Sequence, residues 1–184
     1  GLGRTRGFDV KVVPSRQIAL SNGQVTRVSS SLIRSLLEAG RTADAALALG
    51  RPFRLIGRVV QGRGKGRQIG FPTLNMERPG QVVPAEGVYA GWVLGSPSRE
   101  GLLSQEVRLP AVFSIGRART FGDGLPHLIE AHVLSWPVPE PAISWMAMEF
   151  SDRLRAQQAF PTQDELVSQI RRDCRRARSI LGQG

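Results

Sequence analysis

The chain has 184 residues, 41% of them hydrophobic, which suits one ordinary domain or one domain with a smaller appendage. Lys and Arg number 25 against 15 Asp and Glu, so the formal charge of +10 favours anionic partners such as nucleic acid, nucleotides or acidic membranes. A single cysteine excludes an internal disulfide framework and a multi-cysteine zinc site, and two isolated histidines do not suggest a metal centre.

The sequence gives no sign of a membrane or secretory destination. No apolar run approaches the roughly 18 residues of a membrane span, and the N-terminal GLGRTRGFDV lacks the apolar centre of a secretory signal. We therefore expect no membrane partner and a reducing cytoplasmic location. The chain begins at Gly1 rather than Met, as expected of a piece of a longer protein.

The first fifty residues have a mixed α/β pattern. FDVKVV, residues 8–13, alternates and is β-branched, which predicts a strand. Ser29–Ser31 offer N-cap hydroxyls to a helix that Gly40 would end, and residues 42–49 predict a second helix that ends at Gly50. The apolar stripe of the first helix consists of Leu32, Ile33, Leu36 and Leu37.

The pattern changes at Arg51–Pro52. From there to about Phe150 the chain consists mostly of short β-branched or alternating runs between Gly and Pro residues. The clearest runs are FRLIGRVV, GVYAGWVL, VRLPAVFSI, LIEAHVLSW and SWMAMEF. Regular strands with turn signals between them predict a closed antiparallel barrel or a sandwich.

The chain ends in a predicted helix. Thr162 and Glu165 form a capping-box pattern at its start. Its apolar stripe consists of Leu166, Ile170, Cys174, Ala177 and Leu181. We therefore expect Cys174 to be a core residue.

Residues 62–75, GRGKGRQIGFPTLN, form the most distinctive segment. Its glycines let the backbone approach a ligand closely, bare amides can surround a phosphate, and Lys65 and Arg67 add charge. Gly66 after Lys65 does not fit the Walker motif, and Pro72 argues against the helix that a dinucleotide fingerprint needs. The same composition is also typical of a solvated hairpin.

Two neutral oxygen donors follow this loop. Thr73 and Asn75 are two residues apart on an extended segment and so point to the same side. A hydroxyl and an amide carbonyl can hold Mg²⁺ while phosphate oxygens and water complete its octahedron. Taken alone, such a pair in a strand is far more often structural than metal-binding.

The stretch GRVVQGRGKGRQIGFPTLN resembles the signature of riboflavin kinases. The positions in register are Gly57, Val59, Gly62, Gly66, Arg67, Gly70, Phe71, Pro72, Thr73 and Asn75. Further similarity lies in Gly87–Tyr89, Ser114–Gly116, Glu130, His132, Leu154, Arg155 and Phe160, and in DELVSQIRRD of the last helix. The resemblance implies a riboflavin kinase domain over residues 51–184. Its implied fold is mainly β, a six-stranded antiparallel Greek-key β-barrel with a long C-terminal helix.

Residues 1–50 resemble a different module. GLGRTRGFDV and VSSSLIR are similar to the last motifs of the FMN adenylyltransferase module that precedes the kinase in bacterial bifunctional FAD synthetases. This implies a short α/β remnant of a nucleotidyltransferase domain. Its upstream half is absent, so Ser29, Ser30 and Arg34 have no complete site to serve, and we expect no adenylyltransferase activity from this chain.

The resemblance also implies an activity, the transfer of the γ-phosphoryl group of ATP to the 5′-hydroxyl of riboflavin, giving FMN. The implied ATP- and phosphate-binding residues are Gly62, Gly64, Lys65, Gly66, Arg67, Gly70 and Thr73. Thr73 and Asn75 match the family's Mg²⁺ ligands, and Glu130 matches its general base, which we expect at the mouth of the barrel. His132 shares the strand face of Glu130, and we expect it to be a packed or supporting group. Arg155 and Phe121 are expected at the flavin end.

Two segments depart from the family pattern. Arg119–Phe121 replaces the usual Pro-Thr-Phe, and PVPEPAISW lacks a Leu-Tyr-Gly that usually follows the glutamate strand. A kinase-like barrel that binds flavin without turning it over is therefore an alternative. A basic nucleic-acid-binding barrel is another, although 6% aromatic residues and no basic strand interleaved with aromatics argue against it.

Overall fold

The computed structural model describes Gly7, Lys11 and residues 13–104, 107–117, 127–135 and 143–182, without the side chains of Arg117 and His127. Most of the strand predicted at residues 8–13 therefore lies outside the described residues. So do Phe121 and most of the two segments that depart from the family pattern.

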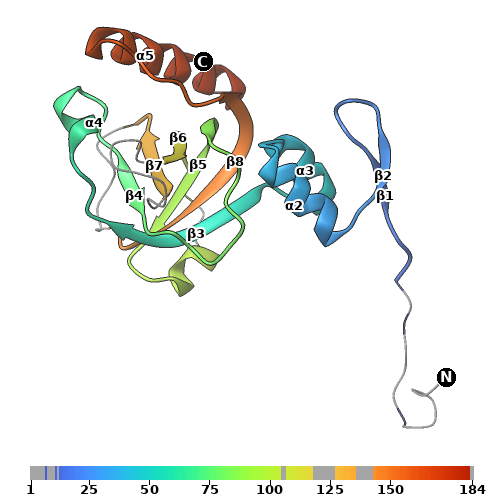
Figure 1. Cartoon of the computed structure of the whole chain (residues 1–184). Helices are drawn as coiled ribbons and strands as arrows, with labels where there is room; N and C mark the ends of the chain where they lie inside the picture. Colours follow the sequence, from blue (N-terminus) through green and yellow to red (C-terminus); the bar gives the residue numbers. More distant parts are fainter. Residues whose placement is uncertain are drawn as a thin grey trace.

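Six strands form a closed barrel in the order β3-β4-β7-β6-β5-β8, and every neighbouring pair is antiparallel (Figure 1). The strands are β3 (Phe53–Val60), β4 (Leu74–Met76), β5 (Gly87–Ser96), β6 (Leu109–Arg117), β7 (His127–Val133) and β8 (Trp145–Arg155). The residue patterns alone left a barrel and a sandwich open, whereas the family resemblance implied a six-stranded antiparallel barrel, which the structure confirms. Its order differs from a simple meander because β4 pairs with β7 and β8 closes the ring between β5 and β3.

The barrel interior is filled by every second side chain of its strands, as the period of two predicts. Phe150 lies among aromatic neighbours, with ring centroids 5.3 Å from Tyr89 and 5.1 Å from Phe113 in edge-to-face arrangements. On β7 the interior positions are Ile129, Ala131 and Val133. The residues between them therefore face the outside of the barrel.

An N-terminal unit lies beside the barrel (Figure 1). It consists of a hairpin of β1 (Gln17–Ala19) and β2 (Val25–Arg27), followed by α2 (Ser30–Glu38) and α3 (Thr42–Leu49). The hydroxyl of Ser29 accepts a hydrogen bond from the backbone of Leu32 at 3.2 Å, which confirms the predicted N-cap. Gly50 follows α3 with a φ of 71°, which confirms that end.

The N-terminal unit and the barrel share packing. Phe53 packs against both the helical core and the barrel core, and α3 lies against β8 and β3. The backbone amide of Ala85 donates to Leu37 at 2.9 Å, and the hydroxyl of the fully buried Tyr89 donates to the Ala85 carbonyl at 2.5 Å. One continuous set of contacts thus runs from α2 into the barrel.

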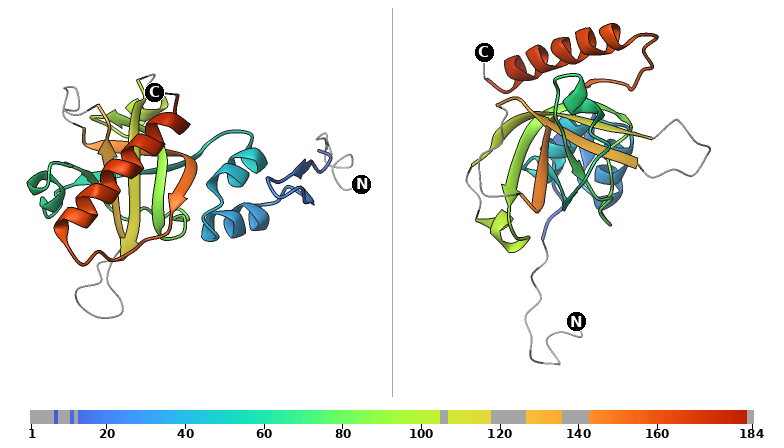
Figure 2. Two further views of the ribbon diagram at one scale, coloured as in Figure 1. Left: turned by 90° about the horizontal axis from the view of Figure 1, so that it is seen from above. Right: turned by 90° about the vertical axis from the view of Figure 1, so that its left-hand side faces the viewer.

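The C-terminal helix, α5 (Gln163–Ile180), lies across the outside of the barrel (Figure 2). Thr162 caps it, accepting from the backbone of Glu165 at 3.3 Å. Cys174 and Ala177 are buried against a cluster on the outer wall, so the expectation of a core cysteine is confirmed. Burial raises the pKa of the Cys174 thiol to about 11.

An ion pair also fastens α5 to the barrel. The Arg155 guanidinium, at the end of β8, donates from Nε and Nη2 to one carboxylate oxygen of Asp173 at 3.0 and 2.9 Å. Asp173 is only 5% exposed and also accepts from Gln169 at 2.8 Å. The helix is therefore held by charge as well as by apolar packing.

No helix within the described ranges is both long enough and apolar enough to cross a membrane.

Candidate functional site

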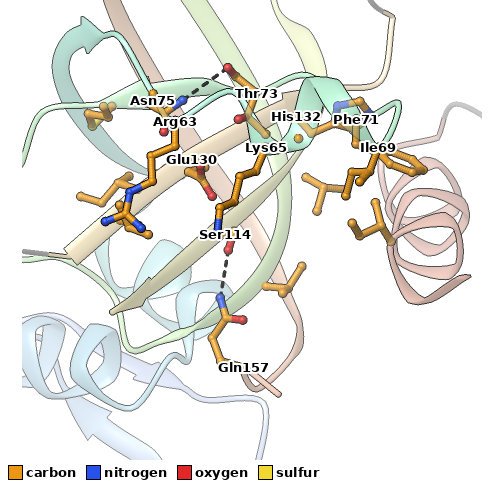
Figure 3. A pocket seen from close by; sticks show the side chains of 18 of the residues that line it. Arg63, Lys65, Ile69, Phe71, Thr73, Asn75, Ser114, Glu130, His132 and Gln157 are labelled. Carbon is orange, nitrogen blue, oxygen red and sulfur yellow. Dashed lines mark hydrogen bonds between the residues drawn. The ribbon is translucent and has the colours of Figure 1, made fainter. Parts of the chain in front are cut away.

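A cavity of about 940 Å³ lies between the outer wall of the barrel, the loop that joins β3 to β4, and α5. Strand residues on its wall include Asn75, Glu130 and Ser114 (Figure 3). The sequence suggested the rim or mouth of the barrel, or a pocket, for the Glu130 carboxylate, and the structure has it in a pocket on the outer wall. The interior positions of β7 belong to the apolar core, so Glu130 and His132 face outward under the loop and the helix.

The loop forms the upper wall of the cavity and is held close to β4. The backbone amide of Phe71 donates to Gly66 at 2.7 Å across it. A Cβ atom at Gly62 would overlap the side-chain amide of Asn75, so only glycine permits this close approach. We expected no helix here, but the single turn α4 (Lys65–Gln68) lies between Gly64 and Gly70, whose φ angles are +70° and +85°.

Asn75 and Glu130 are direct neighbours across the β4–β7 pairing. Opposed residues of antiparallel strands have Cβ atoms about 5 Å apart, so both side chains can reach one small ligand group. Thr73 also lines the cavity, on the same side as Asn75, and its carbonyl accepts from the Asn75 amide at 3.5 Å. The amide nitrogen is thereby turned toward the backbone.

The carboxyl group of Glu130 lies in a desolvated environment. Burial raises its pKa above the ordinary value of 4.5, and the positive charge of Arg63 partly opposes this rise. Within the described ranges, no group donates a hydrogen bond to this carboxylate. It is thus a proton acceptor whose basicity exceeds that of an exposed glutamate.

His132 lies two positions further along β7 and packs against the loop. Its Nδ1 is 2.8 Å from the carbonyl oxygen of Pro72, and its ring meets that of Phe71 edge-on at 5.3 Å. Burial lowers its pKa below the ordinary value of 6.5, so the imidazole is neutral near pH 7. Since a carbonyl can only accept, Nδ1 carries the proton and Nε2 does not. The expected supporting position agrees with these contacts.

The predicted phosphate-binding residues divide into two groups. Those that line the cavity are Gly62, Gly64, Lys65, Gly66 and Thr73, whereas Arg67 and Gly70 do not line it. Arg63, which sequence reasoning did not select, lines it together with Lys65 (Figure 3). No local signal separates Arg63 from the other cations of this loop.

Ser114 and Gln157 were also missed as site residues. Ser114 faces Glu130 across the β6–β7 pairing, and the Gln157 amide donates to its hydroxyl at 2.9 Å and to the Ile115 carbonyl at 3.1 Å. A second cavity of about 260 Å³ shares Glu130, Ser114 and Gln157 with the first. Glu130 therefore borders both spaces.

Of the two residues predicted at the flavin end, the structure describes only Arg155. Arg155 lines the large cavity, but its guanidinium is held by Asp173 and lies 5.7 Å from the Phe160 ring centroid. Phe121 lies outside the described residues.

The family described as Flavokinase, riboflavin kinase, matches residues 49–181. The chain belongs to the riboflavin kinase family. The bifunctional riboflavin kinase/FMN adenylyltransferase of Escherichia coli K12 is 36% identical over 180 residues, which is 98% of this chain and 53% of that protein. The chain thus spans about half the length of the curated relatives it matches.

Two solved structures share the fold of this riboflavin kinase family member. A structure described as a macrolide-efflux protein from Streptococcus pneumoniae superposes with a TM-score of 0.70 and 27% identity, over 88% of this chain and 49% of that one. Riboflavin kinase from Trypanosoma brucei gives a TM-score of 0.51 and 24% identity, over 71% of this chain and 80% of that one. The latter similarity concerns the fold alone.

Proposed function

We propose that this chain transfers the γ-phosphoryl group of ATP to the 5′-hydroxyl of riboflavin, producing FMN and ADP. The observation that carries the proposal is the pairing of Asn75 with Glu130 under a glycine-rich loop, within one cavity. Phosphoryl transfer requires mainly positioning and charge neutralisation, with one group to orient the attacking hydroxyl.

Magnesium is the metal that suits the donors present. Thr73 and Asn75 would hold it through a hydroxyl and an amide carbonyl, and the weak bond from the Asn75 amide nitrogen to the Thr73 carbonyl leaves the amide oxygen available. Among the described residues, no group of three or more His, Cys, Asp or Glu could hold a metal ion. Such a neutral pair fits a cation that arrives with nucleotide phosphates, and Mg²⁺ when bound neutralises charge on the β- and γ-phosphate oxygens.

The loop would bind the phosphates themselves. Its backbone between Gly62 and Gly66 lines the cavity, and Lys65 and Arg63 supply positive charge beside it. The cavity of about 940 Å³ lies at the upper end of the range of about 300–1,000 Å³ that is common for small-molecule sites, which supports binding of substrates of this size.

Glu130 would act as the general base. Its carboxylate accepts the proton of the 5′-hydroxyl as that oxygen forms a bond to the γ-phosphorus, and the bond between this phosphorus and the bridging oxygen breaks to release ADP. The raised pKa of its carboxyl group supports the role, because a stronger base removes the proton more readily.

We further propose that residues 51–184 are the kinase domain and residues 1–50 the remnant of an adenylyltransferase domain. The family match beginning at residue 49 and the adenylyltransferase activity named for the E. coli relative support this division. We place the enzyme in the cytoplasm, with ATP and riboflavin as its small-molecule partners.

Incubation with riboflavin, ATP and Mg²⁺, followed by chromatography for FMN and FAD, tests the function. We expect FMN without FAD, and we expect Glu130→Gln to lower kcat by about 100-fold or more while Mg–ADP binding persists. Normal turnover of Glu130→Gln would show that another group is the base. Quenching of riboflavin fluorescence without FMN formation would identify a barrel that binds flavin but does not phosphorylate it.

A further inference from the structure

The catalytic strand β7 is tied to the loop by a side chain as well as by the sheet. His132 Nδ1 donates to the Pro72 carbonyl at 2.8 Å, a contact between residues 60 positions apart. The backbone pairing of β4 with β7 begins only at Leu74, opposite Ala131. Thr73 would be the next position, opposite His132, and it lies outside the ladder.

The position of Thr73 therefore depends on contacts other than strand pairing. Pro72 has no N–H group, so its carbonyl is the only backbone hydrogen-bonding group it offers. That carbonyl belongs to the peptide group that leads into Thr73, and His132 holds it. The imidazole thus continues the pairing by one residue beyond the point where the backbone ladder stops.

The ring of His132 is itself held in place. Phe71 packs edge-on against it, and the Phe71 amide is bonded to Gly66 at 2.7 Å. His132 is partly buried and lines the same cavity as Thr73. The loop is therefore fixed at both ends of the segment from Gly66 to Pro72.

We propose that His132 is a positioning residue, whose hydrogen bond to Pro72 orients Thr73 toward the metal-bound nucleotide phosphates. The inference rests on the proposed function, since it concerns how the metal–nucleotide complex is bound. It assigns His132 no part in proton transfer.

Two substitutions to amide side chains distinguish the effect of losing the hydrogen bond from the effect of losing the aromatic ring. In His132→Asn the side-chain N–H can lie where Nδ1 lies and still reach Pro72, whereas the longer side chain of His132→Gln places its N–H near the Nε2 position. Both variants lose the aromatic ring that meets Phe71 edge-on. His132→Leu keeps apolar bulk and loses every donor.

Calorimetry with Mg–ADP, with ADP in EDTA, and with riboflavin alone gives the readouts, beside kcat and the Mg²⁺ concentration for half-maximal rate. We expect His132→Asn to remain close to the wild type. We expect His132→Gln and His132→Leu to bind Mg–ADP about 10–100-fold more weakly, while metal-free ADP and riboflavin affinities stay unchanged.

Equal Mg–ADP affinities for His132→Asn and His132→Gln would overturn the proposal. Parallel losses of all three ligands in every variant would also overturn it, because they would show a merely structural role. If the wild type forms no FMN, the proposed function fails, yet the Mg–ADP comparison still decides the role of His132. If the wild type binds no Mg–ADP, both the proposed function and the proposed role of His132 are wrong.

Discussion

Glu130 carries a charge on a strand whose other described side chains are mostly apolar. Its neighbours Ile129 and Ala131 are among the most buried residues of the barrel, yet Glu130 itself faces the cavity. Since burial raises its pKa, the folded state is penalised whenever this carboxyl group is ionised. The residue is well suited to accept a proton and poorly suited to stabilise the fold.

Substitution of Glu130 by Gln should therefore increase stability near neutral pH. The folded-state pKa lies above the unfolded value of 4.5, so the penalty is present above the folded pKa and absent below pH 4.5. Thermal melts in Mg²⁺-free buffer should show a higher midpoint for Glu130→Gln than for the wild type at pH 7 to 8, with the gap closing as the pH falls toward 4.5.

The control for this prediction is Glu77→Gln, which removes a charge from an exposed position just after β4. It should leave the midpoint nearly unchanged. A lower midpoint for Glu130→Gln at pH 8 would contradict the desolvation argument.

The residue pattern within single segments predicted some site residues and gave no indication of others. Thr73 and Asn75 follow from the alternation of an extended segment, and Glu130 from a carboxylate in an apolar strand together with the family motif. Gln157 and Ser114 become neighbours only through contacts between distant segments. Polar residues of these types occur on any surface, so no spacing rule marks them.

The helix α5 shows how one element can serve both folding and binding. One stripe of it packs on the outer wall of the barrel, while Leu166, Ile170 and Asp173 line the cavity. The ion pair of Asp173 with Arg155 therefore fixes a wall of the site as well as the end of the chain.

Breaking this ion pair should loosen the helix. Asp173→Asn keeps the side-chain volume but leaves the largely buried Arg155 guanidinium without its counter-charge, which should cost about 3 kcal/mol in the free energy of unfolding. The matched change Asp164→Asn, at an exposed site in the first turn of α5, should cost no more than about 1 kcal/mol. Urea denaturation of both variants measures the difference, and similar losses would show that the buried pair contributes little.

Elements with a local signal were predicted and those with a distant cause were not. The Thr162 cap and the stripe of α5 follow from spacing within one segment. The residue patterns alone could not separate a barrel from a sandwich, because the closure of the barrel depends on pairings such as that of Phe53 with Phe150, nearly one hundred positions apart. The family resemblance, not local spacing, implied the barrel. The turn of α4 was missed because glycines and the nearby Pro72 argue against helix, yet four residues suffice for one turn.

At the scale of the whole molecule, the N-terminal unit is joined to the barrel by close packing. Gly40, directly after α2, has a φ of +73°, and a Cβ there would lie 3.0 Å from both the Tyr89 hydroxyl and the Arg153 side chain. The sequence identified Gly40 as a helix end. It gave no indication that the same residue also meets the barrel.

Gly40→Ala should therefore destabilise the protein by more than the strain of the left-handed backbone alone would. Gly23, in the β1–β2 hairpin, has a similar φ of +81° and no atom within 4 Å of a built Cβ. Gly23→Ala should cost about 1–2 kcal/mol through the left-handed conformation, and Gly40→Ala should exceed it. Denaturation followed by tryptophan fluorescence measures both changes, and equal losses would show that the junction adapts freely.

Because the cavity lies on the outer wall, neighbouring residues of β7 belong to different parts of the protein. Ile129, Ala131 and Val133 complete the hydrophobic interior, while Glu130 and His132 face the space where substrates would meet. Substitutions at the outward-facing positions of β7 can therefore change the chemistry of the cavity while the core residues between them stay the same. A barrel with its chemistry inside would have no such freedom, since each catalytic change there would also be a packing defect.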